Sequence, residues 1–212
     1  MNTKTQTIDQ SQLADLHLEK GGHASPINGM CFMEAVAYLT GEPHSDRPEC
    51  VSPVLGSWGR EVNDAMPTDR RQELKAFIPE MVGTAGDGKD EARGFMCADF
   101  AVRVIAPMAL GAAGLSDHAT KLRELPEIVD KKTATVAAAA AYRASAAAYP
   151  AAYAAAAAYR AATDAEAVYR AAAAAAGVAA AYAATDDASP IWDAVIAFTP
   201  KLIAARADPQ AL

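Results

Sequence analysis

The chain has 212 residues, enough for one domain of ordinary size with an appended segment. Its formal charge is −7, and a negative chain repels phosphate backbones, so we expect no nucleic-acid partner. Residues 1–12 are polar and lack the apolar stretch of a secretory signal, and no long run of large apolar side chains follows. These features predict a cytoplasmic protein without a membrane segment, whose three cysteines are thiols or metal ligands rather than disulfides.

The first half of the chain carries clear signals for helix ends. Residues 1–20 form a polar N-terminal segment, and a glycine-rich and proline-rich loop follows it. A helix is predicted over residues 30–40, because Gly41 is placed to end it in a left-handed conformation. Ser52 and Pro53 predict the next helix start, since the serine hydroxyl accepts an unpaired amide and proline has no amide to pair.

Three further helices are expected before residue 125. Thr68 is expected to cap the first of them, and Ser116 the last. Between them, residues 91–110 have apolar side chains at helical spacing, and Pro107 is expected to kink or end this helix. No segment alternates as a strand does, so residues 21–125 are predicted to form a compact helical front domain with long ordered loops, and the fold class is all-α.

An alanine-rich tract occupies residues 133–185. Alanine has the highest helix propensity and Pro150 interrupts the tract, so a helical hairpin is predicted. Helices with small side chains can approach one another closely, which makes the tract a simple hairpin or an assembly surface that meets another subunit. Residues 189–206 have apolar side chains at helical spacing and predict an amphipathic C-terminal helix.

The densest chemistry lies in the stretch GMCFMEAVAYLTGEPHSDRPECVSP, residues 29–53, and three interpretations of it stay open. The first is a metal site, because two thiolates and two imidazoles suit a tetrahedral zinc ion. Glu34 and Asp46 are then expected to accept hydrogen bonds from the imidazole rings. The spacing contains no Cys-x-x-Cys pair, so the pattern is weakly specific; the four candidate ligands are His23, Cys31, His44 and Cys50.

The second interpretation is a cysteine nucleophile. Cys31 opens a predicted helix, where the positive end of the helix dipole is expected to lower the pKa of the thiol. A nearby histidine would be the base and an aspartate would orient it; the candidates are His23, His44 or His118, with Asp46 or Asp99. Papain-like and transglutaminase-like hydrolases place that histidine on a sheet, and no sheet is predicted here.

The third interpretation is structural. The cysteines are then small buried apolar residues, and polar side chains form a network that holds the loop against the helices. The expected members of this network are Glu34, Asp46, Arg47, Asn63, Asp64, Arg93 and Asp99.

The front block GGH…GMCFMEAVAYLTGEPHSDRPECVSPVL…ND, the following GTAGD and the alanine-rich tail that closes on WDAVIAF resemble a family known by its sequences. This family is a group of uncharacterised actinobacterial and phage proteins, in which a Cys/Glu/His/Pro front motif precedes alanine tracts of variable length. The resemblance covers most of the chain and implies a bacterial or phage setting. It implies no catalytic residue.

These observations lead to one predicted function and two alternatives. We expect a non-enzymatic binding or assembly protein that associates with itself or another protein through the alanine-rich helices, with zinc as the candidate cofactor. The first alternative is a cysteine-dependent hydrolase or transferase that uses Cys31. The second alternative is a small-ligand binding protein whose pocket is built around the loop that follows residue 40.

Overall fold

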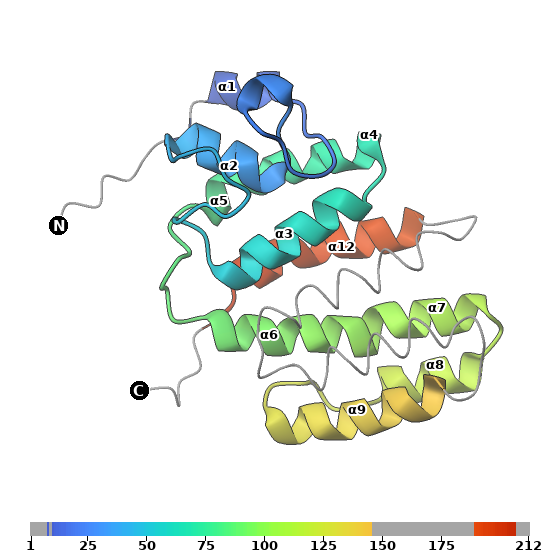
Figure 1. Cartoon of the computed structure of the whole chain (residues 1–212). Helices are drawn as coiled ribbons and strands as arrows, with labels where there is room; N and C mark the ends of the chain where they lie inside the picture. Colours follow the sequence, from blue (N-terminus) through green and yellow to red (C-terminus); the bar gives the residue numbers. More distant parts are fainter. Residues whose placement is uncertain (1–7, 9, 146–188, 207–212) are drawn as a thin grey trace.

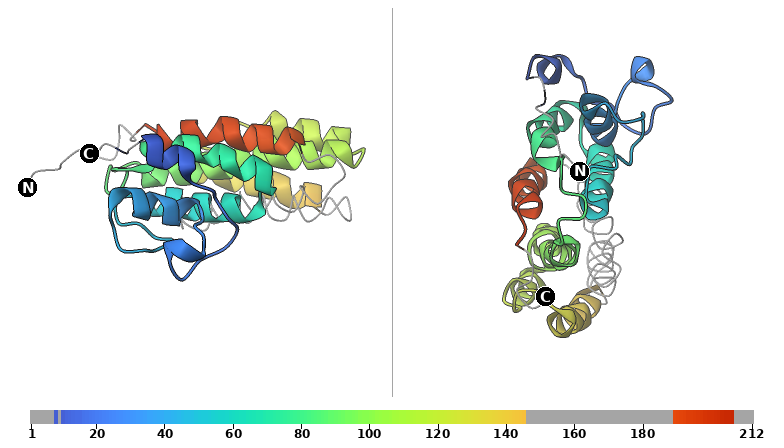
Figure 2. Two further views of the ribbon diagram at one scale, coloured as in Figure 1. Left: turned by 90° about the horizontal axis from the view of Figure 1, so that it is seen from above. Right: turned by 90° about the vertical axis from the view of Figure 1, so that its left-hand side faces the viewer.

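The computed structural model describes residues 8, 10–145 and 189–206, and these residues are helices joined by ordered loops (Figure 1). Within them no strand forms, and one isolated bridge joins Leu18 to Met30. The predicted all-α class is therefore confirmed. Figure 2 shows the helices stacked from α1 and α2 at one end, through α3 and α12, to α8 and α9 at the other.

The helix ends predicted at the front of the chain are confirmed. Gly41 adopts a left-handed conformation with φ 71° and ψ 19° and ends α2. The Ser52 hydroxyl accepts a hydrogen bond from the Leu55 amide, and Pro53 is the first residue of α3. The elements of this part are α1 (Gln10–Asp15), the 3₁₀ turn η1 (Pro26–Asn28), α2 (Phe32–Thr40) and α3 (Pro53–Ala65).

The segment after α3 is a chain of short turns rather than one helix. Thr68 does not cap it, because Pro67 takes the cap position and Thr68 is the first helical residue. The turn is held instead by the buried Arg71, which donates to the carbonyl oxygens of Asn63 and Met66, both at 2.7 Å. The elements are α4 (Thr68–Arg71), the 3₁₀ helix η2 (Gln72–Phe77) and α5 (Ile78–Met81).

Three consecutive elements form one continuous helical rod: α6 (Asp90–Asp99), the π-helix η3 (Phe100–Ile105) and α7 (Ala106–Ala112) (Figure 1). Pro107 was expected to kink or end this helix, and that expectation is wrong. The π turns just before the proline change the hydrogen-bond register, which accommodates a residue that has no amide.

The rod separates two apolar clusters, which explains its composition. Phe100 and Ile105 belong to the larger cluster with α2, α3 and α12, whereas Phe95 and Val102 belong to a smaller cluster with α8 and α9. By length and composition alone the rod is the one described helix that resembles a membrane span, but 61% of its apolar window is buried inside the protein.

The smaller cluster is closed by α8 (Ser116–Arg123) and α9 (Lys131–Ser145). Ser116 does not cap α8 as expected, because Leu115 takes the cap position. Five of the alanines of α9 are buried inside this cluster; they are Ala134, Ala137, Ala138, Ala141 and Ala144. The rest of the predicted hairpin, including Pro150, lies outside the described residues.

The predicted amphipathic C-terminal helix is present as α12 (Ser189–Ile203), and it runs beside α3 (Figure 1). Ile191, Val195 and Leu202 are buried in the larger cluster, as their spacing predicts. Pro200 lies inside this helix without ending it. The Trp58 ring nitrogen of α3 donates to the Thr199 hydroxyl at 3.2 Å, which joins the two helices across the core.

Candidate functional site

The buried carboxylate of Glu34 organises the start of α2. The Cys31 amide donates to Glu34 Oε2 at 2.8 Å, and Cys31 Sγ accepts a weak hydrogen bond from the Glu34 amide at 3.5 Å. This arrangement is a capping box in which a cysteine takes the place of the usual serine or threonine. The Cys-x-x-Glu spacing of the sequence was the signal for it.

Two histidines predicted as metal ligands meet around the same carboxylate. His23 Nδ1 lies 2.8 Å from Glu34 Oε2, and the His23 amide donates to Oε1 at 2.7 Å. His44 Nε2 donates to the His23 carbonyl oxygen at 2.9 Å and lies 3.7 Å from Glu34 Oε1. Burial alone would raise the pKa of Glu34, but the hydrogen bonds from the His23 and Cys31 amides and from the His23 ring outweigh it and lower the pKa.

The fourth predicted metal ligand, Cys50, lies at the other end of the loop. The Cys50 amide donates to Glu42 Oε1 at 3.1 Å, and its carbonyl oxygen accepts the amides of Gly83 and Ala85. Among the described residues, no group of three or more His, Cys, Asp and Glu side chains is placed to hold a metal ion. The geometry therefore gives no support to a zinc site made of His23, Cys31, His44 and Cys50.

The environment of Cys31 also differs from the expectation for a nucleophile. Its side chain is buried, and this burial raises the pKa of the thiol to about 12, with a further contribution from the negative charge of Glu34. The expected lowering by the helix dipole is thus wrong for this position. Asp46, a candidate to orient the base, lies instead beside Arg60, at 3.7 Å from its Nε atom.

The structural network is present, but it has more than one centre. Asn63 accepts the Phe32 amide at 3.1 Å and donates to the Glu19 carbonyl oxygen at 2.8 Å, and Asp64 accepts the Gly21 amide at 2.8 Å. These bonds fasten the loop before α2 to α3. Arg93 and Asp99, expected in the same network, lie elsewhere: Arg93 pairs with Asp87, and Asp99 with Arg103.

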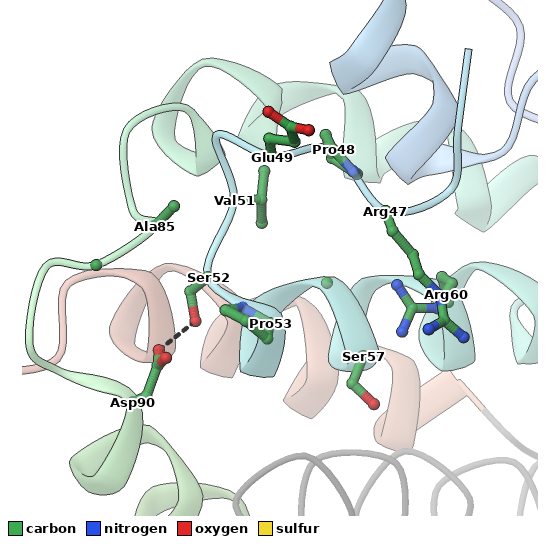
Figure 3. A pocket seen from close by; sticks show the side chains of 12 residues that line it. Arg47, Pro48, Glu49, Val51, Ser52, Pro53, Ser57, Arg60, Ala85 and Asp90 are labelled. Carbon is green, nitrogen blue, oxygen red and sulfur yellow. Dashed lines mark hydrogen bonds between the residues drawn. The ribbon is translucent and has the colours of Figure 1, made fainter. Parts of the chain in front are cut away.

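A cavity of about 750 Å³ lies where the loop after Asp46 runs into α3 (Figure 3). Its walls come from residues 47–53, from the first turns of α3 and from the loop that precedes the rod. The side chains that define it are Arg47, Val51, Ser52, Arg60, Ala85 and Asp90.

The two ends of the cavity have different chemistry. Arg47 and Arg60 lie side by side at one end, and Ser52 and Asp90 lie at the other (Figure 3). The Arg60 guanidinium is oriented by a 3.0 Å hydrogen bond to the Asp46 carbonyl oxygen. The Ser52 hydroxyl donates to Asp90 Oδ1 at 2.5 Å.

Gly56 lines the cavity between these two ends. A Cβ atom added there would have Arg60 Nη1, at 3.4 Å, as its nearest neighbour, which is an ordinary van der Waals contact and not a clash. The sequence predicted a pocket at this loop only as an alternative, and it did not identify the walls that α3 and the loop before the rod contribute. A glycine inside an otherwise normal helix pattern was the available signal, because such a glycine is costly unless packing or function requires it.

No protein-family model matches the chain, and no curated protein or solved structure matches it either. The fold and the site therefore define the class on geometry alone. In its described residues the chain is an all-α protein with a buried carboxylate, Glu34, that organises a loop, and with a cavity with polar ends beside that loop.

Proposed function

We propose that the protein binds a small molecule in the cavity between the loop 47–53, α3 and the loop before the rod. The observation that carries this proposal is the cavity itself, with arginines at one end and a serine–aspartate pair at the other. Ligand pockets in proteins typically have volumes of about 300–1,000 Å³, apolar walls and a few polar groups that orient the ligand. The cavity of about 750 Å³, with Val51, Pro53 and Ala85 in its walls, fits that description.

The walls of the cavity are held in place without a ligand, which favours binding because little order has to be created. The carboxylate of Glu42 accepts the amides of Glu49 and Cys50, at 2.5 and 3.1 Å. The Ser52 amide donates to the Thr84 hydroxyl at 2.9 Å, which fastens the loop to the opposite wall. The many polar groups of residues 41–53 are thereby explained as the frame of a pocket.

The other functions predicted from the sequence gain less support. A raised pKa at Cys31 does not favour a cysteine enzyme. Self-association through residues 133–185 stays a prediction, because residues 146–188 lie outside the described part of the chain. Within that part, the buried alanines of α9 pack against their own chain.

A pair of substitutions at Gly56 tests the proposal. Gly56→Phe is expected to place a ring inside the cavity and obstruct it, whereas Gly56→Ala adds one methyl group and leaves most of the volume open. Melting temperatures of both variants and of the wild type are measured against a collection of small metabolites. Since a ligand at a hundred times its Kd stabilises a protein by about 2.7 kcal/mol, a binding compound raises the melting temperature by several degrees.

Compounds that stabilise the wild type and Gly56→Ala but not Gly56→Phe support the proposal. Ala85→Trp, from the opposite wall, is the second blocking variant if Gly56→Phe does not fold. The proposal is contradicted if no compound in the collection raises the melting temperature of the wild type more than that of the blocking variant.

A further inference from the structure

We infer that the ligand is a small organic anion and that Arg47 and Arg60 bind its oxyanion group. This inference rests on the proposed function, because it concerns the same cavity. It specifies which chemical group of the ligand the arginine end of the cavity binds.

The first argument is the charge at that end. Both guanidinium groups face one carboxylate, that of Asp46, whose oxygen atoms lie 3.9 Å from Arg47 Nε and 3.7 Å from Arg60 Nε. These distances are too long for hydrogen bonds. Two cations beside one carboxylate leave an excess positive charge, and the Glu49 carboxylate lies apart from the two guanidinium groups (Figure 3).

The second argument is the geometry of the donors. A guanidinium presents a planar fork of N–H groups that matches a carboxylate or phosphate, and such charged hydrogen bonds are about twice as strong as neutral ones. Arg60 is only 26% exposed and is oriented by its bond to the Asp46 carbonyl oxygen, so it is positioned before a ligand arrives. Arg47 is 79% exposed and is free to turn onto the bound group.

The third argument is the contrast with the other end. Asp90 accepts the Ser52 hydroxyl and lies 3.3 Å from the buried guanidinium of Arg93, which it shares with Asp87, so at this end two carboxylates face one cation. This end therefore does not compete with the arginine end for the anionic group of a ligand. Between the ends, Val51 and Pro53 offer apolar surface, which suits the carbon skeleton of the anion.

Two fluorescent probes of almost the same shape test the inference. 8-Anilinonaphthalene-1-sulfonate carries an oxyanion, and N-phenyl-1-naphthylamine is the same ring system without it. Both are titrated into the wild type, into Gly56→Phe and into the double variant Arg47→Gln/Arg60→Gln. The matched control is Arg143→Gln, which removes an exposed arginine from α9, far from the cavity.

We expect the double variant to lose binding of the anionic probe in the cavity and to keep binding of the uncharged probe. The double variant should bind the sulfonate at least about tenfold more weakly, because charged hydrogen bonds are lost, while its affinity for the uncharged probe stays the same. Arg143→Gln should match the wild type with both probes. Displacement of the sulfonate probe by benzoate or by inorganic phosphate then tells whether the natural group is a carboxylate or a phosphate.

The outcomes separate this inference from the proposed function. If Gly56→Phe blocks both probes but the double variant binds the sulfonate as well as the wild type, the cavity binds ligands and the inference about charge is wrong. The same conclusion follows if neither benzoate nor phosphate displaces the probe. If Gly56→Phe changes the binding of neither probe, the cavity is not their site and both proposals are overturned.

Discussion

Cys31 shows how the surroundings of a residue can outweigh its place in a helix. Burial raises the pKa of its thiol from 9.0 to about 12, which lowers the thiolate fraction at neutral pH about a thousandfold. We therefore expect iodoacetamide to label Cys31 far more slowly in the folded protein than in guanidinium chloride at the same pH. Peptide mapping by mass spectrometry gives the rate at each cysteine. Labelling of folded Cys31 at the rate of a free thiol would contradict this environment.

Glu34 is the residue on which the loop before α2 depends. Glu34→Gln should lower the free energy of unfolding by about 2–3 kcal/mol at pH 7, because hydrogen bonds to a charged, buried acceptor are lost. Its pKa is lowered from 4.5 in the folded state, so its stabilising effect is present above pH 4.5 and is lost as the pH falls through the folded-state value. The gap between wild type and variant should therefore narrow below pH 4.5.

Urea denaturation at several pH values measures this gap. Glu124→Gln, at an exposed carboxylate in α8's C-terminal cap, is the control and should leave stability unchanged at every pH. A gap that stays constant down to acidic pH would show that the Glu34 charge does not stabilise the fold.

At the scale of elements, two glycines of α3 should respond in opposite ways to the same substitution. Gly56→Ala should stabilise the protein by about 0.5–1 kcal/mol, because alanine favours a helix and the added Cβ would only make an ordinary van der Waals contact with Arg60 Nη1, at 3.4 Å. At Gly59 the added Cβ would lie 2.8 Å from Met33 Cε and 3.1 Å from Phe32 Cδ1, both in the core. Gly59→Ala should therefore destabilise the protein by about 1 kcal/mol.

Urea denaturation of the two variants checks this pair, and each variant is the other's control. Both carry the same chemical change in the same helix, so a difference between them reports the packing alone. Equal effects would mean that Met33 moves aside without cost.

The helix ends show which features the sequence can specify. Gly41 ends α2 and Ser52 begins α3 through groups within a few residues of each, so local chemistry was enough to predict them. Thr68 and Ser116 were wrongly predicted as caps, because the residue before each takes that position. Pro107 was wrongly predicted to break the rod, because a π-helix packed between two core clusters absorbs it.

The position of the candidate site in the chain could be predicted, but most of the residues that line it could not. Its loop stood out by its density of polar residues and prolines, and the pairing of that loop with helices was expected. Arg47 was assigned to a structural network, and Arg60 and Asp90 were not singled out. The cavity joins Arg47 to Asp90, which are distant in the chain, and only the packing of the loop, α3 and the rod brings them together.

At the scale of the whole molecule, the fully buried Arg93 joins the start of the rod to the loop just before it and to the end of α12, more than 100 residues away in the sequence. Its guanidinium makes two hydrogen bonds to the Asp87 carboxylate, at 2.8 and 2.7 Å, and so holds the loop before the rod. It also donates to the carbonyl oxygens of Leu202 and Ile203, at 3.2 and 3.0 Å, in the last turn of α12, where carbonyl groups lack the helical partner that they have further along a helix. Through Asp90 the same guanidinium supports one end of the cavity.

Arg93→Met should lower the free energy of unfolding by about 3–5 kcal/mol, because removing one partner of a buried ion pair leaves charge and carbonyl groups without compensation. Methionine keeps much of the side-chain volume, so the loss of stability comes from the missing hydrogen bonds and charge rather than from a cavity. Arg103→Met is the matched control, since Arg103 pairs with Asp99 on the same rod but is 28% exposed, and its loss should cost about 1 kcal/mol or less. Urea denaturation compares the two. If Arg93→Met costs no more than Arg103→Met, the C-terminal helix and the cavity wall are held by apolar packing and not by this guanidinium.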